Sequence, residues 1–235
     1  MKDNAGLYSI TIQDICSMYI LLTAATKMEI QPTIDFLRQH DFQYHGHEID
    51  VLITGIGSIS TTYLLTYNIH NHRPDYLLQA GIAGSFSPNY PPGSLVFVNE
   101  DISGDVGVEE NGMFKDVTDM GLQQADHGPY TGKYLVNPYC SDWEEDNVPF
   151  VRSITINEIT TRASRIEQLQ QKYSPVVESM EGAAFHYTAL MESIPFMQIR
   201  SISNFVGERD KSKWQMKPAI DVLNAKLIEI IKNLD

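Results

Sequence analysis

The stretch VESMEGAA at residues 177–184 decides the fold, together with the stretch QIRSISN at residues 198–204. Both contain extended apolar segments, and the first turns directly into a predicted helix. Glu181 therefore lies at a strand-to-helix junction, and Asn204 is expected just past a short strand that begins near Pro195. Because ligands bind at such strand ends in open α/β sheets, we expect both side chains to face one site.

Apolar strands alternate with helices along the chain, which predicts a single-domain, three-layer α/β/α fold with a central mixed, twisted sheet. The strands that precede residues 55–57 and 81–84 both run into glycines, which suggests a shared crevice. Further strands are expected over residues 18–25, 95–98 and 151–156, and helices after Glu29, up to Asn71, and over residues 161–173, 182–191 and 218–234.

Length and composition allow one full domain, because the chain has 235 residues of which 43% are hydrophobic. Residues 1–17 show no sustained period and precede the first convincing strand, which Met18 opens. We interpret residues 1–17 as an N-terminal extension, possibly upstream of the native start, and residues 18–235 as the functional domain. The alternative is a genuine N-terminal strand or arm.

The charge balance disfavours nucleic acid as a partner, because the formal net charge is −13 and the one basic cluster, at residues 209–217, is small. Cys16 and Cys140 have no metal-ligand spacing and are expected to be free thiols. No apolar run reaches the length that spans a membrane, and the first residues lack the order of a signal peptide. We expect a cytoplasmic protein.

Two further features concern possible sites. Glu29 lies where the first strand turns into a helix, so it could contribute to a site at the strand end. The simpler interpretation is that the dipole of the helix favours a carboxylate near its N-terminus. The seven histidines show no zinc-ligand pattern, so no metal and no cofactor are expected, and His186 is expected to pack inside a helix. The polar segment 99–147 is long for a connection, which is typical of a functional loop or an arm to a partner subunit.

Three motifs resemble one family. ATKME at residues 25–29, ESMEGAA at 178–184 and SNFVGERDKS at 203–212 are similar to the futalosine hydrolases of the purine nucleoside phosphorylase and nucleosidase superfamily. The likeness extends from about Met18 to the C-terminus. It implies a nucleosidase of menaquinone biosynthesis that works as a homodimer or larger homo-oligomer, with a small-molecule nucleoside as its ligand.

The resemblance also implies a division of roles within the site. Ile82 departs from the pattern, because related adenosine-type nucleosidases carry a serine there, and that role is not transferred. The implied roles are water activation by Glu29, ribose contacts by Met180 and Glu181, purine contact by Asn204, and backbone contacts to the base by Ala83 and Gly84.

The residue types fit cleavage of an N-glycosidic bond. Such a bond breaks through a cation-like sugar and a departing anionic base, so one carboxylate can stabilise the sugar while a second takes a proton from water. Hypoxanthine presents the two acceptors O6 and N7, which suit the NH₂ group of Asn204, whereas adenine would suit a protonated aspartic acid. Alternatively, Asn204 only caps the following turn.

Two sequence features bear on the nucleophile and on the rest of the substrate. No arginine lies in residues 23–29, 55–60 or 79–86, so water is favoured over phosphate as the nucleophile. The charged segment 208–214 is either a solvated loop or a subsite for the carboxylate of a substrate tail. In the second case, that carboxylate would meet Arg209, Lys211 or Lys213, with Phe205 or Trp214 against the tail's ring.

The sequence therefore predicts a cofactor-independent N-glycosyl hydrolase. The expected reaction is hydrolysis of futalosine to hypoxanthine and dehypoxanthine futalosine. The alternatives are an inosine-type phosphorylase, a methylthioadenosine-type nucleosidase, or a catalytically silent nucleoside-binding protein. Because Glu29 and Glu181 are both present, the silent protein is disfavoured.

Overall fold

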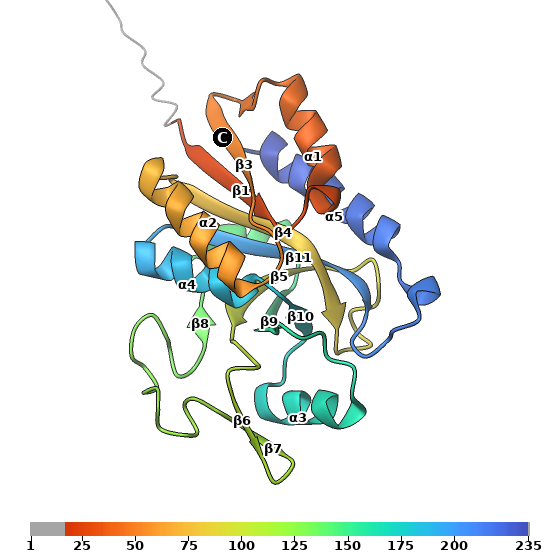
Figure 1. Ribbon diagram of the computed structural model, residues 1–235. Coiled ribbons are helices and arrows are strands. Elements are labelled where there is room, and N and C mark those ends of the chain that lie inside the picture. Colours follow the sequence, from red (N-terminus) through yellow and green to blue (C-terminus); the bar gives the residue numbers. More distant parts are fainter. Residues whose placement is uncertain (1–16, 235) are drawn as a thin grey trace, which may run out of the picture.

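Four parallel strands form the centre of a mixed sheet in the computed structural model, which describes residues 17–234 (Figure 1). They lie in the order β11 (Phe196–Phe205), β4 (Tyr76–Ser85), β1 (Tyr19–Ala24) and β3 (His47–Ile53), with the short β2 (Gln43–Tyr44) antiparallel at one edge.

The sheet continues beyond β11 and curls back on itself. β5 (Leu95–Asp101) runs antiparallel to β11, and β9 (Phe150–Thr155) and β10 (Val177–Ser179) follow. β10 also pairs with the end of β4, so that five strands close into a ring. This pairing places Glu178 opposite Gly84, while the pairing of β11 with β4 places Asn204 opposite the same glycine.

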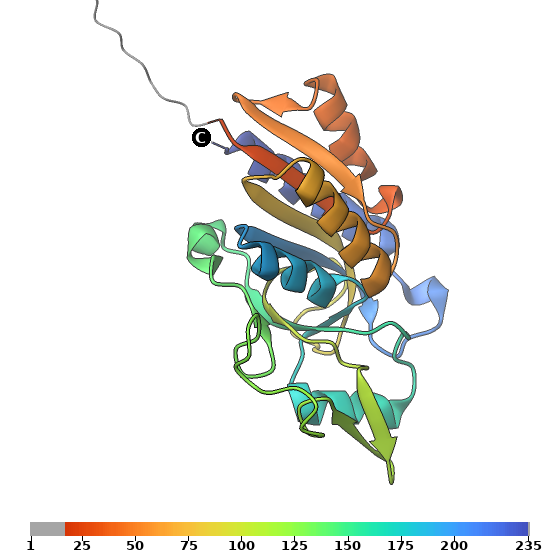
Figure 2. The ribbon, with the colours of Figure 1, turned by 60° about the vertical axis from the view of Figure 1, so that its left-hand side comes forward.

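Helices cover both faces of the sheet, as Figures 1 and 2 show, and the predicted three-layer α/β/α class is confirmed. α1 (Lys27–Gln39) and α5 (Met216–Lys232) lie on one face, and α2 (Ser58–Asn71) and α4 (Gly182–Glu192) lie on the other. α3 (Ala163–Tyr173) lies near the ring of strands, at the bottom of Figure 1.

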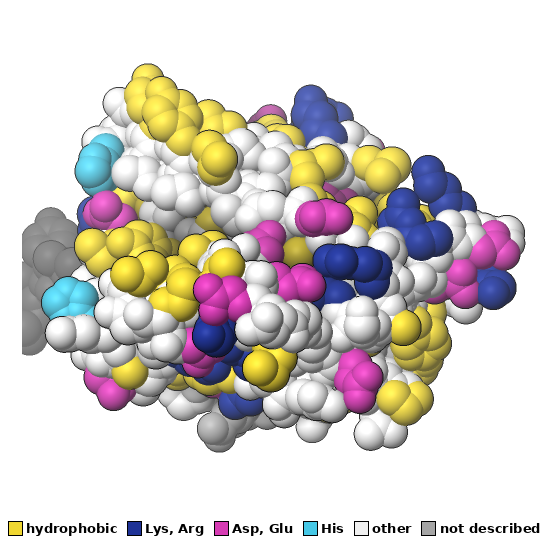
Figure 3. All heavy atoms as spheres, turned by 60° about the horizontal axis from the view of Figure 1, so that its bottom comes forward, with side chains coloured by type: hydrophobic (Ala, Val, Ile, Leu, Met, Phe, Trp, Pro, Cys, Tyr) yellow, Lys and Arg dark blue, Asp and Glu magenta, His cyan; other side chains and the backbone are white. Residues whose placement is uncertain are grey.

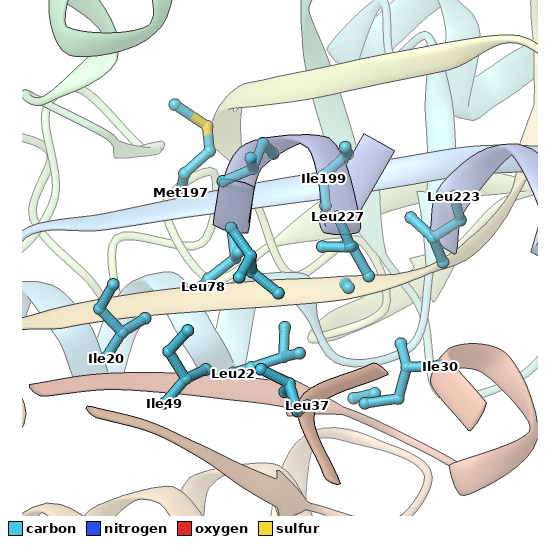
Figure 4. Close-up of a cluster of buried hydrophobic side chains, with 14 of the residues drawn as sticks. Ile20, Leu22, Ile30, Leu37, Ile49, Leu78, Met197, Ile199, Leu223 and Leu227 are labelled. Atoms are coloured by element: carbon cyan, nitrogen blue, oxygen red, sulfur yellow. The ribbon is translucent and has the colours of Figure 1, made fainter. Parts of the chain in front are cut away.

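Two apolar layers hold the helices to the sheet. Ile20 and Leu22 of β1 point toward α1 and α5, where they meet residues such as Leu37 and Leu227 (Figure 4). Leu21, between them in sequence, packs with α2 and α4. The strand is therefore apolar on both sides, as is typical of a parallel sheet covered twice, and each such buried side chain stabilises the fold by about 1.5–3 kcal/mol.

The long polar segment 99–147 contains short elements that the sequence did not reveal. After the end of β5 come a hairpin of β6 (Gly107–Glu110) and β7 (Met113–Asp116), then β8 (Leu135–Val136) and the 3₁₀ helix η1 (Cys140–Asp146). Trp143 Nε1 in η1 donates to the Tyr76 hydroxyl at 2.6 Å, which ties this end of the segment to β4. A role as an arm to a partner remains a prediction.

One expected element boundary is wrong, because Asn204 lies inside β11, a strand of ten residues, rather than past a short one. The register shifts between Ile202 and Asn204, so the strand continues beyond a local irregularity. The proposed extension over residues 1–17 falls almost wholly on residues 1–16, which lie outside the described part of the chain.

Three surface features bear on possible partners. None of the helices described within residues 17–234 is both long and apolar enough to cross a membrane. The face that carries α3 and the β6–β7 hairpin shows acidic, basic and hydrophobic side chains interspersed (Figure 3). Cys140 is a free thiol, half-buried at the first residue of η1.

Candidate active site

A cavity of about 270 Å³ opens at the carboxyl ends of the central strands, where the sequence placed the site. Its walls come from β10, from the ends of β4 and β11, from the segments that follow β1, β3, β10 and β11, and from the loop around Thr160. Six of the nine predicted site residues line it: Glu29, Ala83, Gly84, Met180, Glu181 and Asn204.

Glu29 is held in place by three donors. Its Oε2 accepts from the backbone N–H and the hydroxyl of Thr26, both at 2.9 Å, which forms a capping box at the start of α1. Its Oε1 accepts from the backbone N–H of Ile82 at 3.1 Å. The side chain is 6% exposed. Glu29 thus serves the helix start, as the simpler interpretation expects, and also forms part of the cavity wall.

Glu181 is the second buried carboxylate of the wall and lies immediately before α4. Its Oε1 accepts from the backbone N–H of Gly57 at 3.0 Å, in the turn that follows β3. Burial raises the pKa of Glu181, although the Arg200 guanidinium and the Gly57 N–H act in the opposite direction. The charge of Glu29 raises that pKa further, so the two carboxylates influence one another.

Arg200 is a site residue that the sequence reasoning missed. It lies in the middle of β11, is 1% exposed, and its Nη1 lies 3.9 Å from Glu181 Oε2. An ideal Cβ on Gly81 would overlap with that Nη1 and lie 3.1 Å from Glu29 Oε1, so the guanidinium lies close to both carboxylates. The available signal was an arginine within an apolar strand segment, because a charged residue is rarely buried there unless it is paired.

Asn204 lines the cavity beside Gly84, whose ideal Cβ would lie 3.6 Å from Asn204 Nδ2. The amide also makes local hydrogen bonds: Oδ1 accepts from the Ser203 hydroxyl at 2.8 Å, and Nδ2 donates to Phe205 O at 2.9 Å. One N–H of the amide therefore remains for a ligand.

Glu178 is another lining residue to which the sequence assigned no role. Its Oε1 accepts from the backbone N–H of Thr160 at 3.1 Å, and burial raises the pKa of its carboxyl group. Glu208 also lines the cavity and pairs with Lys213 at 2.9 Å. The wall therefore carries four carboxylates, and among the lining residues described there is no lysine or arginine.

The three remaining predicted site residues do not line the cavity. Phe205 is 40% exposed, and Lys211 is exposed in the 3₁₀ helix η2 (Lys211–Lys213). Arg209 is exposed, with its Cζ 5.5 Å from the centre of the Trp214 ring, and Trp214 does line the cavity. Arg209 thus contacts a residue of the wall through this ring, and Lys213 contacts another, Glu208, through its ion pair.

Metal-ligating groups converge at one place among residues 17–234. Glu48, Asp50 and His72 are exposed at the far end of β3 and bring three ligand atoms within 4.8 Å of one another. The group lies outside the cavity lining. Tyr19 engages two of its members, since its ring stacks on His72 and its hydroxyl donates to Asp50, so the cluster has a structural explanation.

Known sequences resemble this chain over most of its length. The family model of the phosphorylase superfamily matches residues 17–233. A futalosine hydrolase of Streptomyces coelicolor is 30% identical over 180 residues, which cover 74% of each chain. A 5'-methylthioadenosine/S-adenosylhomocysteine nucleosidase of Maridesulfovibrio salexigens is 27% identical over 199 residues, covering 82% of this chain and 84% of the relative.

Solved structures share the fold at lower identity. The S-adenosylhomocysteine nucleosidase of Streptococcus pyogenes, in complex with 5-methylthiotubericidin, superposes with a TM-score of 0.74 at 17% identity and covers 94% of this chain and 99% of its own. A futalosine hydrolase of Helicobacter pylori gives a TM-score of 0.70 at 18% identity, with 91% and 99% coverage.

Proposed function

The chain belongs to the phosphorylase superfamily, and on that premise we propose that it hydrolyses the N-glycosidic bond of futalosine and releases hypoxanthine. The observation that carries the proposal is the convergence of Glu29, Glu181 and Asn204 on one cavity, with Arg200 behind the two carboxylates. The futalosine hydrolase of Streptomyces coelicolor, at 30% identity, supports the choice of substrate.

The two carboxylates have different parts in the reaction. Glu181 accepts hydrogen bonds from the ribose hydroxyls and stabilises the positive charge that grows on the sugar, while Met180 packs against the ring. Glu29 takes the proton of the attacking water as the bond from the water oxygen to C1′ forms. The C1′–N9 bond breaks in the same step, and its electron pair leaves with the base as an anion, which is then protonated by solvent. The three hydrogen bonds that Glu29 accepts fix the orientation of its carboxylate, and therefore the side from which it can take a proton.

Asn204 reads the purine. The free N–H of its amide donates to O6 of a 6-oxopurine, and the backbone at Ala83 and Gly84 borders the base. Adenine presents an N6 donor there, which would oppose the amide donor, and such a mismatch costs about 1–3 kcal/mol. This favours hypoxanthine as the leaving group.

Water is favoured over phosphate by the charge of the wall. Four carboxylates line the cavity, and the nearby Arg200 is already engaged by Gln79 at 2.9 Å and by Glu181. A phosphate dianion would therefore meet net negative charge, whereas neutral water would not.

The carboxylated tail of futalosine would leave the cavity over Trp214 toward Arg209. Arg209→Ala should then raise KM for futalosine and leave KM for inosine unchanged, because inosine has no such tail. An equal KM for futalosine in both proteins would exclude Arg209 as the tail's partner.

Product analysis tests the function itself. The purified protein is given futalosine, inosine or methylthioadenosine, each with and without phosphate, and the released base and sugar are identified. Hypoxanthine from futalosine without phosphate is the expected result. A strict need for phosphate would overturn the assignment as a hydrolase.

A methylthioadenosine-type nucleosidase is the second candidate, supported by the relative from Maridesulfovibrio salexigens at 27% identity. Asn204 and Ile82 speak against it, because the adenosine-type site is expected to have an acid and a serine at these positions. Faster release of adenine from methylthioadenosine than of hypoxanthine from futalosine would decide for this candidate.

A second copy of the chain is the proposed partner of the outer face of α2. Ile59, Tyr63 and Tyr67 on that face are 88%, 66% and 60% exposed, and they border a shallow hollow. Ile59→Asp should shift the protein toward monomers in light scattering, whereas Arg38→Asp on α1 should not. A wild-type monomer would refute this assembly.

The family match over residues 17–233 supports assigning the nucleosidase domain to residues 18–235. The free thiol of Cys140 supports the cytoplasm as its compartment, since reduced cysteines persist there.

A further inference from the structure

Four polar side chains are enclosed behind the cavity. Asp101, His186 and Gln198 are 0% exposed, and Arg200 is 1% exposed. A buried guanidinium is costly unless hydrogen bonds and charges satisfy it, and its usefulness depends on where its N–H groups point. The contacts of Arg200 on the side away from the cavity therefore set the position of its guanidinium relative to Glu29 and Glu181.

The protonation of His186 follows from its contacts. Its Nδ1 lies 3.0 Å from the backbone oxygen of Leu135, and because a carbonyl oxygen only accepts, Nδ1 carries the proton. Burial lowers the pKa of His186 to about 4, so the ring is neutral near pH 7. Its Nε2 is therefore a hydrogen-bond acceptor.

Gln198 connects this acceptor to Arg200. With the amide oriented so that its NH₂ faces His186, the NH₂ donates to His186 Nε2 at 2.9 Å, and the oxygen accepts from Arg200 Nε at 2.9 Å and from Arg200 Nη2 at 3.2 Å. The reversed amide would turn NH₂ toward the N–H groups of Arg200 and oxygen toward a lone pair of His186. The neutral tautomer of His186 thus selects one orientation of the amide.

Gly182 gives the amide its space. This residue begins α4 within the VESMEGAA motif, and an ideal Cβ on it would lie 2.6 and 3.0 Å from the two polar atoms of the Gln198 amide. The shorter distance is one that a Cβ essentially never shows, and the same Cβ would overlap with Asp101 Oδ2. The glycine of the motif therefore allows α4 to pack directly against Gln198.

We propose that His186 and Gln198 are positioning residues, which hold the Arg200 guanidinium between Glu29 and Glu181 through a fixed chain of hydrogen bonds. The chain runs from Leu135 O through His186 and Gln198 to Arg200. Neither residue lines the cavity, so both act through Arg200. The kinetic part of this inference rests on the proposed nucleosidase function.

A matched pair of variants separates positioning from packing. In His186→Asn the side-chain NH₂ replaces Nδ1–H and keeps the bond to Leu135 O, but the acceptor for Gln198 is lost. In His186→Gln the side-chain oxygen reaches the place of Nε2 and keeps that acceptor, but the bond to Leu135 O is lost. Gln198→Met removes both functions of the amide at similar length.

The kinetic expectation differs between the two variants. His186→Asn and Gln198→Met lower kcat about tenfold to hundredfold, because a displaced guanidinium disturbs the reacting geometry. KM changes little, and His186→Gln stays within about threefold of wild type, a small effect on the kinetic scale. The double variant His186→Asn with Gln198→Met is no slower than Gln198→Met alone. Losses in kcat that simply follow losses in Tm across the variants would overturn the proposal.

A second measurement is independent of turnover. ¹⁵N NMR of the wild-type protein should show Nε2 of His186 as an unprotonated acceptor, and the Nε–H resonance of Arg200 should shift in His186→Asn but not in His186→Gln. An Arg200 resonance that stays unchanged in His186→Asn would refute the chain. If the wild type cleaves no nucleoside while these shifts occur, the proposed function fails and the positioning inference stands.

Discussion

Replacing Glu29 by glutamine tests the assignment of the general base, and its cost can be worked out from the contacts of the carboxylate. Oε2 receives the backbone N–H of Thr26, and Oε1 receives that of Ile82. Whichever way the new amide turns, its NH₂ meets one of these N–H groups. One buried donor is then unpaired, which costs about 1–3 kcal/mol. For a chain of this size, that lowers Tm by about 2–12 °C.

The kinetic effect of Glu29→Gln should be much larger than its structural effect. Loss of a general base lowers kcat about 10²–10⁴-fold. Hypoxanthine released from futalosine is followed by its oxidation in a coupled absorbance assay, and the affinity for free hypoxanthine is measured by calorimetry. Affinity should be largely retained. The exposed Glu48→Gln is the control for loss of a carboxylate. If Glu29→Gln keeps more than a tenth of the wild-type kcat, Glu29 is not the base.

Three further results are expected. Asn204→Asp should lower the preference for inosine over adenosine about tenfold to hundredfold in kcat/KM, because a protonated acid suits adenine; an unchanged ratio would remove Asn204 from base recognition. Gly182→Ala should destabilise the fold by about 1–3 kcal/mol in chemical denaturation, because its Cβ meets the Asp101 carboxylate and the Gln198 amide, whereas Gly128→Ala, with open space around it, should not. Burial raises the pKa of Asp101 to about 6, so the contribution of Asp101 to stability is present below pH 4 and is lost as pH rises through 6. Burial lowers the pKa of His186 to about 4, so the contribution of His186 is present above pH 6.5 and is lost as pH falls through 4. These opposed slopes should leave wild-type stability nearly flat between pH 4 and 6, and Asp101→Asn should expose the rise with pH due to His186, measured as Tm against pH.

Strand and helix positions were predictable because each central strand is apolar on both faces and ends at a turn signal. β1, β9 and α5 lie within two residues of their expected bounds. Asn204 was placed past a strand rather than inside it because the irregularity between Ile202 and Asn204 leaves no mark in the residue types. The short elements in segment 99–147 were hidden by polar composition, since β6 and β7 pair only with one another.

The site was predictable where a motif carried it and unpredictable where only pairing in space did. Glu29 and Glu181 lie 152 positions apart in the sequence, yet both follow strands whose carboxyl ends meet. Arg200 was not predicted because it lies in β11, outside the three segments expected around the anomeric carbon. The parallel register places Arg200 opposite Gly81, and a side chain can cross there only because glycine leaves the space.

The charges of the wall carboxylates and of Arg200 affect both the choice of nucleophile and the stabilisation of the sugar. Glu29, Glu178, Glu181 and Glu208 give the wall an excess of negative charge, and burial raises the pKa of both Glu178 and Glu181. Arg200 opposes that rise at Glu181 from within the sheet, where substrate does not displace it. The cavity can thus keep a carboxylate ionised beside a cationic sugar while its surface stays unfavourable for phosphate. A cation exposed in the wall would also keep the carboxylate ionised, but it would attract phosphate. This gives a physical reason for the guanidinium to lie behind the carboxylates.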